Sequence, residues 1–155
     1  GIPANTGTVD LFILNHFLEH LSYKEGLDLL RECRRCIKTN PPGAMRIIVP
    51  DGALLLSRYP IKDMGAFDEV NAECQVAPTM MKKLWSLLLE NHKACYDGET
   101  LIHTLGEAGW IGKVTAFREV APDYRTNGGL KQILKETLDM HPAISLYVDA
   151  VPIVG

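Results

Sequence analysis

The sequence lacks any long hydrophobic run. None of its apolar stretches approaches the roughly 18 to 20 residues that a membrane-spanning helix needs, and its N-terminus lacks the charged-then-apolar order of a secretory signal. Basic residues are not in excess either, since 16 Lys and Arg against 19 Asp and Glu give a formal net charge of -3. We therefore expect a cytoplasmic protein that binds neither a membrane nor nucleic acid through its overall charge.

Cysteine is scarce and poorly spaced for a metal or redox site. Of the four cysteines, only Cys33 and Cys36 have the two-residue gap that zinc and redox motifs use. Both lie inside a strongly helical stretch, whereas such motifs usually place the first cysteine on a turn or at a helix start. The sequence therefore predicts free, reduced and partly buried thiols.

The first half of the chain has the pattern of strand, helix and strand. With 155 residues, 46% of them hydrophobic, one domain with one core is expected. Residues 9–14 (VDLFIL) form a short apolar run typical of a buried parallel strand. Ser22 and Glu25 predict a capping box at the start of a helix over 23–38, and 45–49 (MRIIV) predicts a second strand. A helical crossover of this length makes the two strands parallel.

The second half of the chain is less regular. Residues 52–78 carry scattered Pro, Gly and acidic residues and predict a short helix followed by an irregular lid or insertion. Asp97 predicts the N-cap of a helix that runs through Ala108 and ends at Gly109. The remaining periodicity predicts helices over 79–90 and 129–140 and strands over 114–120 and 144–151.

These segments resemble a known family. Residues 10–38 (DLFILNHFLEHLSYKEGLDLLRECRRCIK) and 41–51 (PPGAMRIIVPD) resemble the central stretch of class I S-adenosylmethionine-dependent methyltransferases. The H-x-x-x-Y-D sequence at 92–97, ETLIHTLGEAGW at 99–110 and SLYVDA at 145–150 are similar to later parts of that family. In particular, the chain resembles methyltransferase type 11-like proteins, among them small predicted methyltransferases of polysaccharide clusters.

The resemblance implies an α/β fold that is incomplete. It assigns residues 1–155 to a single truncated methyltransferase domain, a C-terminal half with strands 4 to 7 of a Rossmann-like sheet and helices on its faces. Two parallel strands would be followed by an antiparallel closing pair. The family's glycine-rich turn and its acidic residue for the cofactor ribose are missing from this sequence. Because the first strand here would then lack its usual neighbour, we expect a homodimer through that edge.

The resemblance also implies roles for particular residues. S-adenosylmethionine would be the cofactor, with Asn15, His16 and Glu19 at its methionine end. His16 and His20 would be the candidate catalytic bases, although Asn15 and Glu19 could equally be structural residues near a turn and a helix start. On the acceptor side the resemblance places Asp51, Arg58, His92 and Tyr96. Asp51 also suits the N-cap of the next helix.

Three functions remain open at this point. The resemblance favours methyl transfer to a small-molecule or glycan acceptor, and the missing glycine-rich turn favours a non-catalytic remnant that self-associates. His16, Glu19 and His20 also match the H-x-x-E-H pattern of zinc peptidases, in which two histidines share one face of a helix. This metal-dependent hydrolase is a minor alternative, because an apolar strand directly precedes the pattern and leaves little room for a long helix. We assign no metal ligand from the sequence, but the resemblance to some quinone-pathway methyltransferases leaves open weak binding of a divalent ion by His16, Glu19 and His20.

Overall fold

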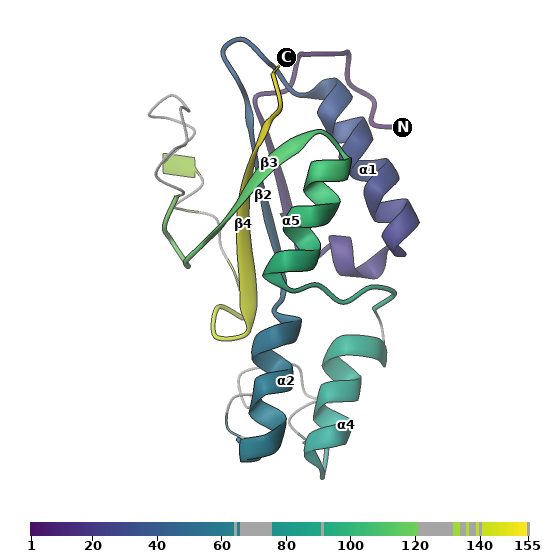
Figure 1. The fold of residues 1–155 in the computed structure, drawn as a ribbon, viewed down its shortest axis with the longest axis vertical. Helices are drawn as coiled ribbons and strands as arrows, with labels where there is room; N and C mark the ends of the chain where they lie inside the picture. Colours follow the sequence, from purple (N-terminus) through teal and green to yellow (C-terminus); the bar gives the residue numbers. More distant parts are fainter. Residues whose placement is uncertain are drawn as a thin grey trace.

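A computed structural model describes residues 1–63, 65, 76–90, 92–120, 132–133, 136, 139 and 141–154 (Figure 1). In chain order the elements are β1 (Leu11–Asn15), η1 (Leu18–His20), α1 (Tyr23–Cys36), β2 (Ala44–Pro50), α2 (Gly52–Ile61), α4 (Met80–Trp85), η3 (Ser86–Glu90), α5 (Gly98–Glu107), β3 (Trp110–Thr115) and β4 (Ser145–Pro152). No helix among these is long and apolar enough to span a bilayer.

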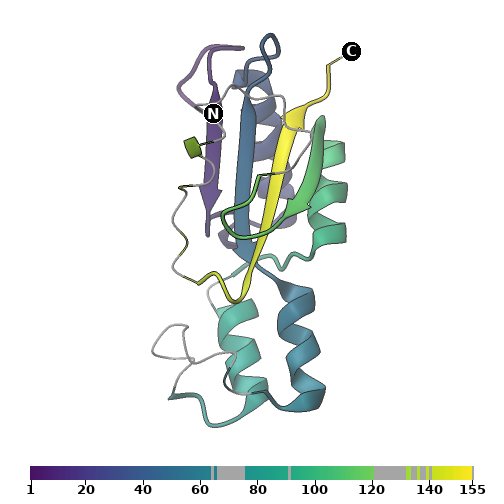
Figure 2. The same ribbon diagram turned by 90° about the vertical axis from the view of Figure 1, so that its left-hand side faces the viewer.

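The strands form one mixed sheet in the order β1-β2-β4-β3 (Figure 2). β1 and β2 are parallel, and β4 runs antiparallel to both β2 and β3. This confirms the predicted α/β fold, with two parallel strands followed by an antiparallel closing pair. Within the described part of the chain β1 has a single neighbouring strand, so it forms one edge of the sheet.

α1 and α5 cover one face of the sheet (Figures 1 and 2). The Ser22 capping box predicted for α1 is present, with Glu25 as its second member. Asp97 caps α5, and Gly109 follows that helix in the left-handed region with φ of 83°. Alternate residues of β2 and β4 point toward these helices, and the main apolar core forms between them around fully buried Leu30, Met45, Ile47, Leu101 and Val148. The single core expected from the sequence is not what the structure has, because a second buried cluster includes Leu55 of α2 and Leu84 of α4.

α2, α4 and η3 lie beyond the carboxyl ends of β1 and β2 (Figure 2). The loop that precedes α5 is held against the start of α2, because the Gly52 amide donates to the Tyr96 carbonyl at 2.8 Å. A Cβ on Gly52 would lie 2.6 Å from Cys95 Sγ, so only glycine permits this close approach. The loop carrying His92 is thereby fixed beside the carboxyl end of β2.

Some sequence predictions differ from the structure. The strand predicted over 114–120 is wrong in its bounds, because β3 starts at Trp110, directly after Gly109, and ends at Thr115. Pairing of β3 with β4 and burial of Trp110 fix this register, and neither is visible in local alternation. The predicted helix over 129–140 lies outside the described residues except at four positions. In the predicted lid over 52–78, α2 is the short helix and most of the remainder lies outside the described residues.

The described cysteines are free, as predicted. Cys33 and Cys36 are buried and Cys95 is half-buried, whereas Cys74 lies outside the described residues. Burial raises the pKa of the Cys33 thiol to about 12, so this thiol stays protonated. This protonated, buried thiol is poorly suited to bind a metal or to act as a redox nucleophile.

Candidate functional site

Asn15 and His16 lie where β1 ends, at the edge of the sheet where open α/β folds bind ligands. His16 adopts a left-handed backbone with φ of 46°, and its amide donates to the Ile48 carbonyl at 2.9 Å. A non-glycine residue in this region is uncommon and turns the chain sharply. The turn leads from β1 directly into η1, so Glu19 and His20 lie beside the end of the strand.

The His16 ring lies between two carboxylates. Its Nδ1 is 3.3 Å from Glu19 Oε1 and its Nε2 is 3.1 Å from Asp139 Oδ1. Burial disfavours the charged ring, but the two carboxylates together outweigh it, so the pKa of His16 is raised. Because both ring nitrogens face carboxylates, the His16 ring links Glu19 to Asp139.

Asp139 and Tyr147 extend this network. The Tyr147 hydroxyl donates to Asp139 Oδ2, and the His141 amide donates to Asp139 Oδ1 at 2.8 Å. Burial and the Asp139 carboxylate raise the pKa of Tyr147. Sequence reasoning missed both residues. Alternation along β4 could have placed Tyr147 on the face opposite α1, but no local signal brings Asp139 to His16 across 123 positions.

His92 meets Glu19 and His20 across the chain. The Lys93 and Ala94 amides donate to the Glu19 carbonyl at 2.8 and 3.1 Å, which fixes this loop against η1. The His20 and His92 rings are then edge to face, with centroids 4.8 Å apart. Burial lowers the pKa of His92. These residues line a cavity of about 180 Å³, which we call the histidine cavity. Its walls are His16, Glu19, His20, Pro50, Leu87, His92, His141 and Ile144.

The other predicted acceptor-side residues are not brought to this cavity. Asp51 caps α2, since its Oδ1 accepts from the Leu54 amide at 3.0 Å. Arg58 pairs with Asp63 at 3.0 Å, near the end of α2. Tyr96 is 1% exposed in the apolar core, where burial raises its pKa to about 12. Of the four residues predicted for the acceptor side, His92 alone lines the histidine cavity.

The H-x-x-E-H helix of a zinc peptidase does not form here. Only Leu18–His20 are helical, as one short 3-10 turn, and His16 precedes it with a positive φ. His16 and His20 therefore do not share a helical face, and the metal-dependent hydrolase built on that geometry is ruled out. The pattern is misleading because it spans a strand end and a turn.

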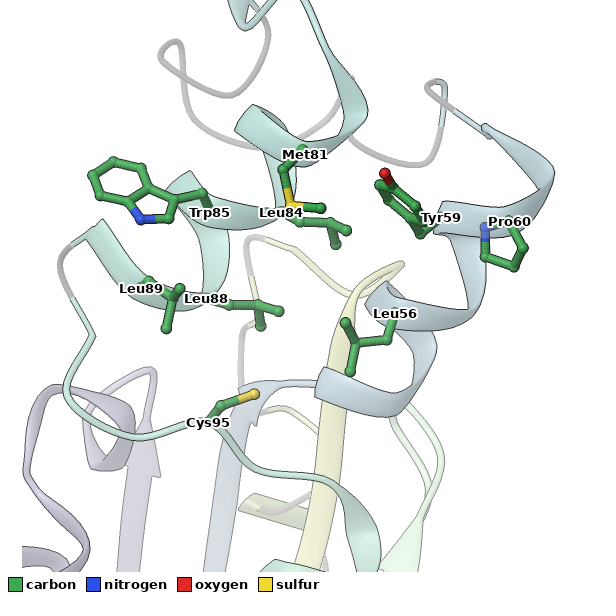
Figure 3. Close-up of a pocket in the computed structure, with 9 residues that line it drawn as sticks. All are labelled: Leu56, Tyr59, Pro60, Met81, Leu84, Trp85, Leu88, Leu89 and Cys95. Atoms are coloured by element: carbon green, nitrogen blue, oxygen red, sulfur yellow. The ribbon is translucent and has the colours of Figure 1, made fainter.

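An apolar pocket of about 370 Å³ lies between α2 and the α4–η3 segment (Figure 3). Its walls are Leu56, Tyr59, Pro60, Met81, Leu84, Trp85, Leu88, Leu89 and Cys95. Several of these side chains are exposed despite their size, among them Leu56 at 57% and Trp85 at 47%. Such a hollow of exposed apolar side chains is typical of a binding site for an apolar group.

Comparison with known proteins reveals similarity in fold alone. No family model matches the chain, and no curated protein matches it. A possible exported protein from Bordetella parapertussis superposes with a TM-score of 0.54 at 15% identity, over 97% of this chain and 41% of that one. A SAM-dependent methyltransferase from Archaeoglobus fulgidus superposes with a TM-score of 0.52 at 17% identity, over 96% of this chain and 61% of that one. The chain thus spans less than two thirds of either protein, and its mixed sheet resembles the Rossmann-like fold of the Archaeoglobus methyltransferase.

Proposed function

We propose that this chain forms part of an S-adenosylmethionine-dependent methyltransferase. The observation that carries the proposal is that this chain, with its sheet order β1-β2-β4-β3, superposes on the Archaeoglobus methyltransferase over 96% of its length. Polar residues gather at the carboxyl ends of its parallel strands, where such sheets bind ligands. Asn15, His16 and Glu19 would contact the methionine end of the cofactor.

The residues of this chain fit only one end of that cofactor. The histidine cavity of about 180 Å³ is smaller than the roughly 300 Å³ at which pockets for whole ligands begin. S-adenosylmethionine, when bound, supplies an electrophilic methyl group. The contacts to its adenosine would come from residues other than those that line this cavity, and we propose a second copy pairing along the edge of β1 as one source.

Of the two predicted bases, His16 is poorly placed for that role. A base needs a neutral ring with a free lone pair, whereas both His16 nitrogens face carboxylates and its pKa is raised. His20 is exposed and lies beside His92. His16 would instead position Glu19.

The acceptor would carry an apolar group. The pocket in Figure 3 is lined by apolar side chains with little polar surface, which favours a ring or short chain over a bare glycan. Binding of the dye 8-anilinonaphthalene-1-sulfonate tests this. Leu56→Glu is expected to abolish the fluorescence gain, whereas Ile111→Glu, at a 59% exposed apolar residue on β3, leaves it unchanged.

Titration calorimetry of the whole chain with S-adenosylhomocysteine tests methyl transfer at its first step. We expect a Kd in the micromolar range that tightens with protein concentration if pairing along β1 completes the site, with light scattering reporting the dimer. Asn15→Ala is expected to weaken binding about tenfold, and Asn5→Ala, in the N-terminal segment, to leave it unchanged. Silence at every protein concentration would favour the non-catalytic remnant instead.

A further inference from the structure

Three groups that bind metals converge from two segments of the chain. Glu19 and His20 come from η1, and His92 comes from the loop before α5. One ligand atom from each lies within 4.8 Å of the other two. Glu19 is buried, His92 is half-buried and His20 is exposed, so the group opens from the interior toward solvent.

A buried carboxylate oxygen in this group lacks a hydrogen bond. Glu19 is 2% exposed, and its Oε2 has no hydrogen-bond partner among the described residues. Its Oε1 faces the His16 ring at 3.3 Å. A buried charged oxygen is costly unless a donor or a cation meets it. The two imidazole rings beside it are the side chains with which proteins most often bind transition metals.

We propose that Glu19, His20 and His92 bind a divalent first-row transition-metal ion of the Zn²⁺ type. Two imidazole nitrogens and one carboxylate oxygen suit such ions, whereas Mg²⁺ and Ca²⁺ require oxygen ligands throughout. Three protein ligands leave at least one coordination position open, as in catalytic zinc sites. The cavity of about 180 Å³ has room for the ion and for a water or a substrate oxygen on that position.

Neighbouring groups orient these ligands. His16 contacts Glu19 Oε1 at 3.3 Å, and Leu87 lies beside His92 in the wall of the cavity. Ligand atoms on one zinc ion lie roughly 3 to 4 Å apart, since each bond is about 2.0 to 2.2 Å long. The observed spread of up to 4.8 Å closes by small side-chain rotations.

The site differs from the one that the H-x-x-E-H pattern implies. His16 is bound between Glu19 and Asp139 and serves as a support, and His92 replaces it as the second imidazole. A metal bound by His20 would occupy the lone pair that a base needs, so metal binding and base catalysis by His20 exclude each other. The proposal does not depend on methyl transfer.

Cobalt titration of the whole chain tests this site. We expect one Co²⁺ to bind per chain, with the visible absorption typical of cobalt in a site of low coordination number. Zn²⁺ should displace the bound Co²⁺, whereas Mg²⁺ should not. His20→Ala and His92→Ala are each expected to weaken binding at least tenfold, a loss in line with disrupted metal sites. His103→Ala is the matched control, because His103 is a 74% exposed histidine 3.6 Å from Glu107 on α5, and it should bind like the wild type.

The two outcomes are distinct. The proposal would be overturned if His20→Ala and His92→Ala bound cobalt as tightly as His103→Ala. It would also be overturned if the folded wild-type protein showed no cobalt absorption. Because His20 is exposed, its alanine variant is expected to fold. Circular dichroism of each variant is the check on folding. The readout requires neither S-adenosylhomocysteine nor an acceptor, so a failure here is separate from a failure of the methyltransferase proposal.

Discussion

The helix-covered face of the sheet and the end beyond β1 and β2 satisfy their polar groups differently. On the covered face, even the indole of buried Trp110 donates to the Leu30 carbonyl at 3.0 Å. Among the described residues, Glu19 Oε2, Arg58 Nε and Ser86 Oγ beyond the strands are buried without a hydrogen bond, whereas in the core the Tyr96 hydroxyl is the one such atom. Regions that only stabilise a fold rarely leave buried groups unpaired, whereas binding sites do. Unpaired buried atoms are therefore more frequent at the end that carries the candidate site than in the packed core.

The largest expected effect is at the covered face. Trp110 is 1% exposed, so Trp110→Ala is expected to lower the free energy of unfolding by ~4 kcal/mol, from the cavity and the lost hydrogen bond. Trp85 is the matched control, because it is 47% exposed at the apolar pocket, and Trp85→Ala should cost below ~1 kcal/mol. Urea unfolding followed by circular dichroism measures both. Equal losses would show that the two ends are packed alike.

A somewhat smaller effect is expected on the opposite face of the sheet. Arg46 and Asp149 face each other across β2 and β4, 1% and 0% exposed, with two hydrogen bonds of 2.8 and 2.9 Å. Asp149→Ala leaves a buried guanidinium uncompensated and is expected to cost ~3 kcal/mol. The double variant Arg46→Met with Asp149→Leu should recover most of that loss.

The control for this pair is an exposed one. Lys24 and Asp28 form a 2.7 Å ion pair on α1 with 85% and 52% of their side chains exposed. Asp28→Ala should leave the urea midpoint nearly unchanged, because water screens such pairs. A loss for Asp149→Ala as small as that for Asp28→Ala would mean that the buried pair contributes no more than a surface one.

Local patterns predicted most of the fold. The apolar runs of β1 and β2, the Ser22 box and the Asp97 cap depend on residues close in sequence, and the structure confirms each of them. β3 was misplaced because its register depends on pairing with β4, which lies about 35 residues away. Local alternation carries no information about such a partner.

Only the part of the candidate site that lies at the end of β1 could be predicted from the sequence. Strand-end position placed Asn15 and His16, but the contact of His92 with Glu19 depends on amides at 93 and 94 that reach back across more than 70 positions. The family resemblance pointed to His92 as a site residue but did not predict that it lies beside Glu19 and His20. Asp139 lay in a stretch read only as a helix, so its contact with His16 could not be foreseen.

The smallest expected effect has the opposite sign. Glu19→Gln removes a buried charge whose Oε2 has no hydrogen bond among the described residues, at the cost of weakening the contact with His16. We expect the free energy of unfolding, measured in EDTA, to stay unchanged or to rise by up to ~1 kcal/mol, as when a functional group is removed from a strained site. Glu25→Ala is the control, because Glu25 accepts from the Ser22 amide at 2.8 Å and the loss of this contact should lower stability. A larger loss for Glu19→Gln than for Glu25→Ala would mean that the Glu19 carboxylate is a structural group, and the contrast between the packed core and the end that carries the candidate site would fail.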